Sequence, residues 1–63
     1  MMPNIVFDGP ELTKDKKKQL IEQFTASASE ITGIPVQAFV VIVKENKLEN
    51  IGVGGQLLAD REK

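Results

Sequence analysis

The feature that most constrains the fold of this chain is an unbroken apolar segment near its middle. Residues 38–43 read Ala-Phe-Val-Val-Ile-Val, and four of these six residues are β-branched. A strand without polar positions needs apolar cover on both of its faces. The chain has 63 residues and no cysteine or histidine, so it lacks the disulfides and the usual zinc ligands that support small cores. We therefore expect oligomerisation to supply the missing stability.

A strand and a helix are predicted before this segment. Residues 4–8, Asn-Ile-Val-Phe-Asp, alternate as in a strand and end at Gly9-Pro10, a pair typical of turns. Thr13 is a predicted N-cap. The apolar residues after it are spaced by three and four, as on one face of a helix of about five turns: Leu20, Ile21, Phe24, Ala28 and Ile31. Gly33 and Pro35 mark the end of this helix.

A strand, a helix and a second strand in this order predict an α+β fold built on a βαβ unit with a parallel two-stranded sheet. One helix covers only one face of that sheet, so we expect another copy of the chain to complete the sheet and cover the open face. Residues 51–58 alternate apolar residues with glycine, which suits a short C-terminal β-hairpin. We expect a single domain over residues 1–63, with a frayed charged tail at 59–63.

The overall charge and the length of the apolar segments exclude several classes of function. Eight basic and nine acidic residues give a net charge of −1, which does not fit a nucleic-acid-binding domain. No apolar run reaches the ~18 residues of a membrane span, and the first residues lack the pattern of a signal peptide. We therefore expect a cytoplasmic protein that binds neither nucleic acid nor membrane.

Most motifs that could carry chemistry have a structural explanation. The segment Gly52-Val53-Gly54-Gly55 is not followed by the lysine and hydroxyl residue of a phosphate loop. Histidine-dependent nucleophile schemes and cysteine nucleophiles are excluded by composition, and we expect no cofactor and no metal. The four lysines near the start of the helix, Lys14, Lys16, Lys17 and Lys18, form either a solvated face or a region that attracts anions to a nearby pocket.

Pro3 is the remaining candidate for catalysis. If Pro3 is the N-terminal residue of the mature chain, its ring nitrogen is a free secondary amine. An amine in an apolar pocket loses solvation of its charged form, which lowers its pKa towards neutrality and makes it an efficient acid and base.

The order of these features resembles the 4-oxalocrotonate tautomerase family. The shared features are Pro3 before the first strand, the Lys-x-x-Leu-Ile motif of residues 17–21, Pro35 before the apolar strand, and Ile-Gly-Val-Gly-Gly at residues 51–55. The resemblance covers Pro3 to Leu58. It implies dimers, joined as trimers of dimers into a homohexamer, and an isomerase that moves a proton within a small enol or 2-oxo acid. In that chemistry the N-terminal proline, matched by Pro3, is the general acid and base.

The chain departs from the pattern of this family at the substrate clamp. Better-known members have arginines before the helix and in the second strand, and an aromatic residue on the hairpin. The aligned residues are Leu12, Val40 and Ile51, which we expect to line the pocket. Three explanations stay open: Lys14 or Lys16 replaces the arginines, another subunit supplies a lysine, or the substrate is not a dicarboxylate.

The second departure concerns the residues before Pro3. The sequence begins Met1-Met2-Pro3, and a retained Met2 would turn the nitrogen of Pro3 into an amide without useful basicity. Either synthesis starts at Met2, so that removal of one methionine exposes Pro3, or the chain does not use proline chemistry. In the second case it is a catalytically inactive oligomer that acts as a structural or binding module.

Overall fold

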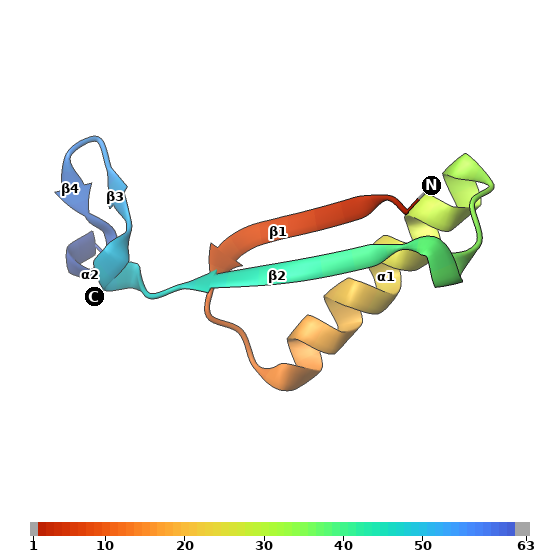
Figure 1. The fold of residues 1–63 in the computed structure, drawn as a ribbon. Helices are drawn as coiled ribbons and strands as arrows, with labels where there is room; N and C mark the ends of the chain where they lie inside the picture. The colour runs from red at the N-terminus through yellow and green to blue at the C-terminus, as the bar shows by residue number, and fades with distance from the viewer. Residues whose placement is uncertain (1, 62–63) are drawn as a thin grey trace.

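The computed structural model describes residues 2–61 (Figure 1). β1 (Asn4–Pro10) leads through a short turn into the helix α1 (Lys14–Thr32), and β2 (Val40–Asn46) follows. β1 and β2 pair in parallel, from Asn4 opposite Val40 to Pro10 opposite Asn46. The predicted βαβ unit with a parallel two-stranded sheet is therefore confirmed.

The ends of both strands lie outside the predicted bounds. β1 does not end before Gly9-Pro10: both residues pair with the end of β2, because a proline is tolerated on an edge strand whose amide is not needed. The second strand does not begin at residue 38. Val36–Ala38 form a 3-10 turn, η1, and β2 continues to Asn46 because its polar end still pairs with residues 8–10 of β1.

Both predicted ends of α1 are confirmed. The hydroxyl of Thr13 accepts a hydrogen bond from the amide of Lys16 at 3.3 Å, which satisfies one of the free donors of the first turn. Gly33 adopts a left-handed conformation with φ 77° and donates its amide to the carbonyl of Ser29 at 2.9 Å. Glycine takes this conformation without the steric cost of a Cβ atom.

The helix covers one face of the sheet and leaves the other open. The ring of Phe7 in β1 packs on the ring of Phe24 in α1, with centroids 6.1 Å apart. On the opposite face, Val6, Val40 and Ile42 expose 53%, 36% and 42% of their surface. No residue of the described part of the chain is fully buried. The single chain thus has a half-core that only α1 covers.

The C-terminal segment forms an arm beyond the end of β2 (Figure 1). It consists of a 3-10 turn η2 (Leu48–Asn50), the antiparallel strands β3 (Gly52–Val53) and β4 (Gln56–Leu57), and a short helix α2 (Leu58–Arg61). Gly54 and Gly55 between the strands have φ values of 59° and 79°, as the two central residues of a type I′ hairpin turn require. The predicted hairpin is confirmed.

The frayed tail expected over residues 59–63 takes a different form where the structure describes it. Ala59, Asp60 and Arg61 belong to α2, and the amide of Leu58 at the start of this helix donates to the carbonyl of Ile51 at 2.8 Å. Residues 62 and 63 lie outside the described part. The start of α2 is therefore bonded to the residue that precedes β3.

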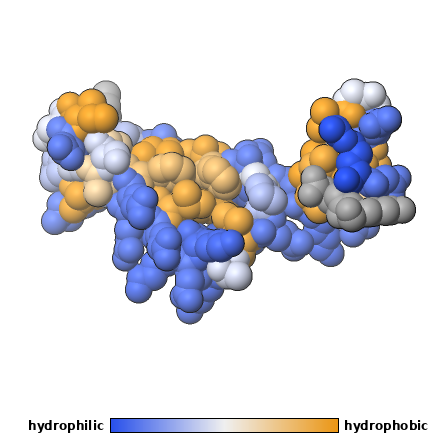
Figure 2. Space-filling view, turned by 180° about the vertical axis from the view of Figure 1, so that it is seen from behind, coloured by the Kyte–Doolittle hydropathy of each residue, from blue (hydrophilic) through white to orange (hydrophobic). Residues whose placement is uncertain are grey.

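The dimensions of the chain are those of an elongated molecule. Its extents are 43 × 23 × 15 Å and its radius of gyration is 14.9 Å, whereas a compact domain of this length has a radius of about 10–11 Å. Apolar side chains lie on the surface over the middle of the molecule and on the C-terminal arm (Figure 2). Among residues 2–61, no helix has the length and apolar character needed to cross a bilayer.

Candidate active site

Pro3 directly precedes β1 and is half-buried. Its carbonyl oxygen accepts a hydrogen bond from the amide of Val40 at 3.0 Å. Val40 is the first residue of β2 and pairs with Asn4, the residue after Pro3. This bond fixes Pro3 beside the first residue of β2. Two of the four residues predicted for the site, Pro3 and Val40, are therefore neighbours.

Leu12 and Ile51, the other two predicted residues, lie towards the opposite end of the sheet. Leu12 follows the end of β1, and Ile51 follows the end of β2 after η2. β1 has seven residues, and at a rise of about 3.3 Å per residue it separates Pro3 from the β1–α1 turn by roughly 23 Å. A single chain therefore does not assemble the predicted pocket.

A groove of about 620 Å³ lies where β1 and β2 end. It is bounded by the last residues of both strands and by the C-terminal arm, with Ile51 in its wall; the lining residues are Asp8, Gly9, Pro10, Asn46, Leu48, Asn50, Ile51, Gly52 and Leu58. The carboxyl ends of parallel strands are common places for ligand binding. Of the four predicted residues, only Ile51 lines this groove.

Leu12 lines a separate groove of about 380 Å³ between the start of α1 and Phe7. Lys16 lines the same groove, whereas Lys14 lies in another one with Lys17 and Lys18. Of the two lysines considered as replacements for the family's arginines, Lys16 is therefore the one that shares a groove with Leu12.

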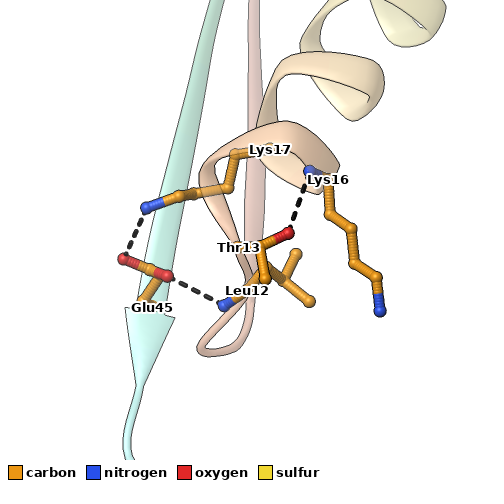
Figure 3. A network of polar contacts seen from close by, with 5 residues as sticks. All are labelled: Leu12, Thr13, Lys16, Lys17 and Glu45. Atoms are coloured by element: carbon orange, nitrogen blue, oxygen red, sulfur yellow. Dashed lines mark hydrogen bonds and ion pairs between the residues drawn. The ribbon is translucent and has the colours of Figure 1, made fainter.

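The turn between β1 and α1 is tied to the end of β2 by a carboxylate (Figure 3). One oxygen of Glu45 accepts a hydrogen bond from the amide of Leu12 at 2.9 Å, and the other accepts one from the ammonium of Lys17 at 3.1 Å. The amide of Leu12, followed by the ammonium of Lys17, lowers the pKa of Glu45 below its ordinary value of 4.5. Glu45 thus stays charged at neutral pH and holds both partners.

Asn46, the next residue of β2, binds the same region from a second position. Its side-chain amide donates to the carboxylate of Asp8 and, at 3.0 Å, to the carbonyl oxygen of Gly9. The last two residues of β2 therefore hold both the end of β1 and the turn that follows it.

Glu45 and Asn46 are not among the residues predicted for the site, because the apolar run that marks the second strand ends at Val43 and these two residues follow it. A signal for these contacts is present in the sequence: both parallel strands have polar residues near their ends. Asp8 lies near the end of β1, and Asn46 is the last residue of β2. In the part of the chain that the structure describes, no cluster of acidic side chains has the arrangement of a metal site.

Comparison with known proteins places these features in context. Residues 3–61 match the family model described as "Tautomerase enzyme". A probable tautomerase of Bacillus cereus is 41% identical over 49 residues, which cover 78% of this chain and 80% of the relative. The 2-hydroxymuconate tautomerase of Bacillus subtilis is 32% identical over 50 residues, or 79% of this chain and 81% of the relative.

A solved structure shares both the fold and a substantial part of the sequence. The crystal structure of TomN, a 4-oxalocrotonate tautomerase homologue in the tomaymycin biosynthetic pathway, superimposes with a TM-score of 0.89 and 38% identity. The superposition covers 94% of this chain and 92% of TomN. The arrangement of strands, helix and C-terminal hairpin is therefore shared with that protein.

Proposed function

Since this chain belongs to the tautomerase family, we propose that it is an isomerase that moves a proton within a small enol or 2-oxo acid, with Pro3 as the general acid and base. The family and the fold indicate a tautomerase-type activity. The role of Pro3 is our proposal, and its main support is that the family match begins at this residue.

The position of Pro3 suits this role. It is half-buried and held at the start of β1 by the hydrogen bond from Val40, so its ring has a defined place in the fold. As a free secondary amine it would take a proton from one atom of the substrate and return it to another, which leaves the enzyme unchanged after each turnover. The reaction needs no cofactor, and we place it in the cytoplasm.

The proposed site requires more than one copy of the chain. Pro3 and Val40 lie at one end of the sheet and Leu12 and Ile51 at the other, roughly 23 Å away. If two copies pair in antiparallel fashion along β1, Pro3 of one copy comes to the β1–α1 turn of the other. The open apolar face and the extended arm support a homo-oligomer, which we propose to be a dimer or a trimer of dimers.

The substrate class follows from what is present at the predicted clamp positions. Leu12, Val40 and Ile51 carry no charge, whereas Lys16 shares the groove of Leu12. A single lysine suits a substrate with one carboxylate better than a dicarboxylate, because it offers one point charge rather than a pair of arginine forks. The relative named 2-hydroxymuconate tautomerase makes 2-hydroxymuconate the natural dicarboxylate for comparison.

The test begins with the N-terminus. A version of the chain that starts at Met2 is compared with one that has both methionines, and intact mass shows which of them ends in a free Pro3. Ketonisation of 2-hydroxymuconate and of 2-hydroxy-2,4-pentadienoate is then followed by absorbance. We expect activity only with free Pro3, and a loss of about 10²-fold or more in Pro3→Ala.

A specific observation supports the alternative function. Met2 precedes Pro3 in the sequence, and as long as it remains the nitrogen of Pro3 is an amide. If protein from its native cells keeps Met2, or if the free-proline form and Pro3→Ala show the same background rate, the chain is an inactive oligomer of this fold. Its role would then be structural or in binding.

A further inference from the structure

The β1–α1 turn carries a residue of the proposed site, so its conformation affects the substrate pocket. Residues 11–13 have no regular secondary structure, yet they carry Leu12, which we placed in the wall of the proposed site. Within the turn and the helix, the contacts are local: Thr13 caps α1 through its hydroxyl and its carbonyl. These bonds fix the start of the helix, but they do not fix the turn relative to the sheet.

Glu45 provides a contact between this turn and the sheet. It lies 33 residues from Leu12 in the sequence, and one of its carboxylate oxygens accepts a hydrogen bond from the Leu12 amide at 2.9 Å. The main-chain amide is a rigid donor, so this bond restricts the backbone of Leu12 directly. Without Glu45, the amide of Leu12 would bond to water instead, and the turn would no longer be held to β2.

The second oxygen of Glu45 strengthens the same connection. It accepts the ammonium of Lys17, on the first turns of α1, at 3.1 Å, and the two side chains are each 32% exposed. Because the ion pair with Lys17 holds one oxygen of the carboxylate, it also orients the other oxygen, which accepts the hydrogen bond from Leu12 (Figure 3). An exposed ion pair by itself contributes little to stability, so the geometry of this pair matters more than its strength.

We propose that Glu45 is a positioning residue, which fixes the β1–α1 turn against the end of β2 and thereby sets the place of Leu12 in the substrate pocket. This inference rests on the proposed function for the role of Leu12 in the site. The hydrogen bond from the Leu12 amide carries the effect, and the contact with Lys17 orients the acceptor.

Hydrogen exchange of the Leu12 amide tests the positioning separately from catalysis. Glu45→Ala is expected to speed this exchange about 5–10-fold, while the amide of Ile42 in β2 keeps its protection. Glu45→Gln keeps an oxygen acceptor and should stay close to the wild type. Lys17→Met removes the ion pair but keeps the carboxylate that accepts from Leu12, so it is expected to speed the exchange less than Glu45→Ala does. Equal Leu12 exchange in Glu45→Ala and the wild type would overturn the proposal.

The unmodified protein offers a second measurement in case Glu45→Ala does not fold. An amide bonded to a carboxylate shifts in the NMR spectrum when that carboxylate is protonated. The Leu12 amide should therefore shift as the pH falls below 4.5, and the absence of a shift would overturn the proposal. Neither measurement depends on activity, and Pro3→Ala should leave both unchanged.

Kinetics then test the consequence for the pocket. With 2-hydroxy-2,4-pentadienoate, Glu45→Ala is expected to raise KM at least about five-fold with a smaller change in kcat, and Glu45→Gln should recover most of this loss. A decrease in kcat alone, with KM unchanged, would contradict a role in placing Leu12. Failure of the proposed function would instead appear as equal rates of the wild type and Pro3→Ala.

Discussion

Replacement of Ile42 by aspartate tests whether the open face of the sheet is covered by another copy. Val6, Val40 and Ile42 expose 53%, 36% and 42% of their surface there. Full burial of such a side chain is worth about 1.5–3 kcal/mol, so covering the exposed fractions contributes roughly 2–4 kcal/mol per chain and about twice that for a two-fold pair. This is a large share of the stability of a small domain.

The effect of the substitution follows from the same estimate. Ile42→Asp removes about 1 kcal/mol of this burial from each chain, and it places two carboxylates in an interface that would exclude water. We therefore expect the dissociation constant to rise at least about 30-fold, which corresponds to about 2 kcal/mol.

Sedimentation velocity across a dilution series measures the change, with the 6.9 kDa monomer as reference. Ser27→Asp is the control, because Ser27 is an exposed polar residue of α1, so a carboxylate there should leave the assembly intact. The reasoning fails if Ile42→Asp associates as tightly as the wild type. It also fails if the wild type is a folded monomer at micromolar concentration.

Three further experiments test other parts of the structure. Gly9→Ala would place a Cβ atom 2.7 Å from the Phe7 ring, so we expect a loss of about 1–3 kcal/mol in urea unfolding, and an unchanged midpoint would contradict this packing. Because the folded pKa of Glu45 is lowered, its contribution to stability is present above pH 4.5 and is lost as the pH falls through the folded value. The difference in unfolding free energy between wild type and Glu45→Gln should therefore shrink below pH 4.5, and a constant difference from pH 7 to 3 would refute it. If each site takes Pro3 from one copy and Ile51 from another, refolding inactive Pro3→Ala together with inactive Ile51→Asp should restore activity. Half of the pairs are then mixed, and each mixed pair has one intact site of two, so we expect about 25% of the wild-type activity. No recovery would place both residues of a site in one copy.

The local signals in the sequence were sufficient to predict the fold. Thr13 and Gly33 mark the ends of α1 through residue types whose backbone preferences are strong. Alternation of Ile5, Val6 and Phe7 assigned the faces of β1, and the apolar run from Val40 required cover on both sides. Each of these properties belongs to a short segment, so it can be read before the chain is folded.

The strand ends and the polar contacts of the site could not be predicted in the same way. Glu45 bonds to an amide 33 residues away, and Asn46 bonds to residues 37 and 38 positions earlier. Their partners are determined by the register of β1 against β2, which the sequence does not state. The predicted strand at residues 4–8 already separates Pro3 from Leu12, but its full length, from Asn4 to Pro10, is set by the pairing of its end with β2.

The lack of fully buried residues between Met2 and Arg61 and the division of the predicted site have one physical origin. A sheet of two strands with a single helix has one uncovered face, and its two ends are one strand length apart. Antiparallel pairing along β1 would bring the Pro3 end of one copy to the Leu12 end of another, and association of such pairs through their open faces would supply the missing cover. The apolar energy that holds the copies together would then also hold the acid–base residue against the substrate pocket. On this view, substitutions on the open face should reduce activity in proportion to the fraction of dissociated chains, even though Val6 and Ile42 need not touch the substrate.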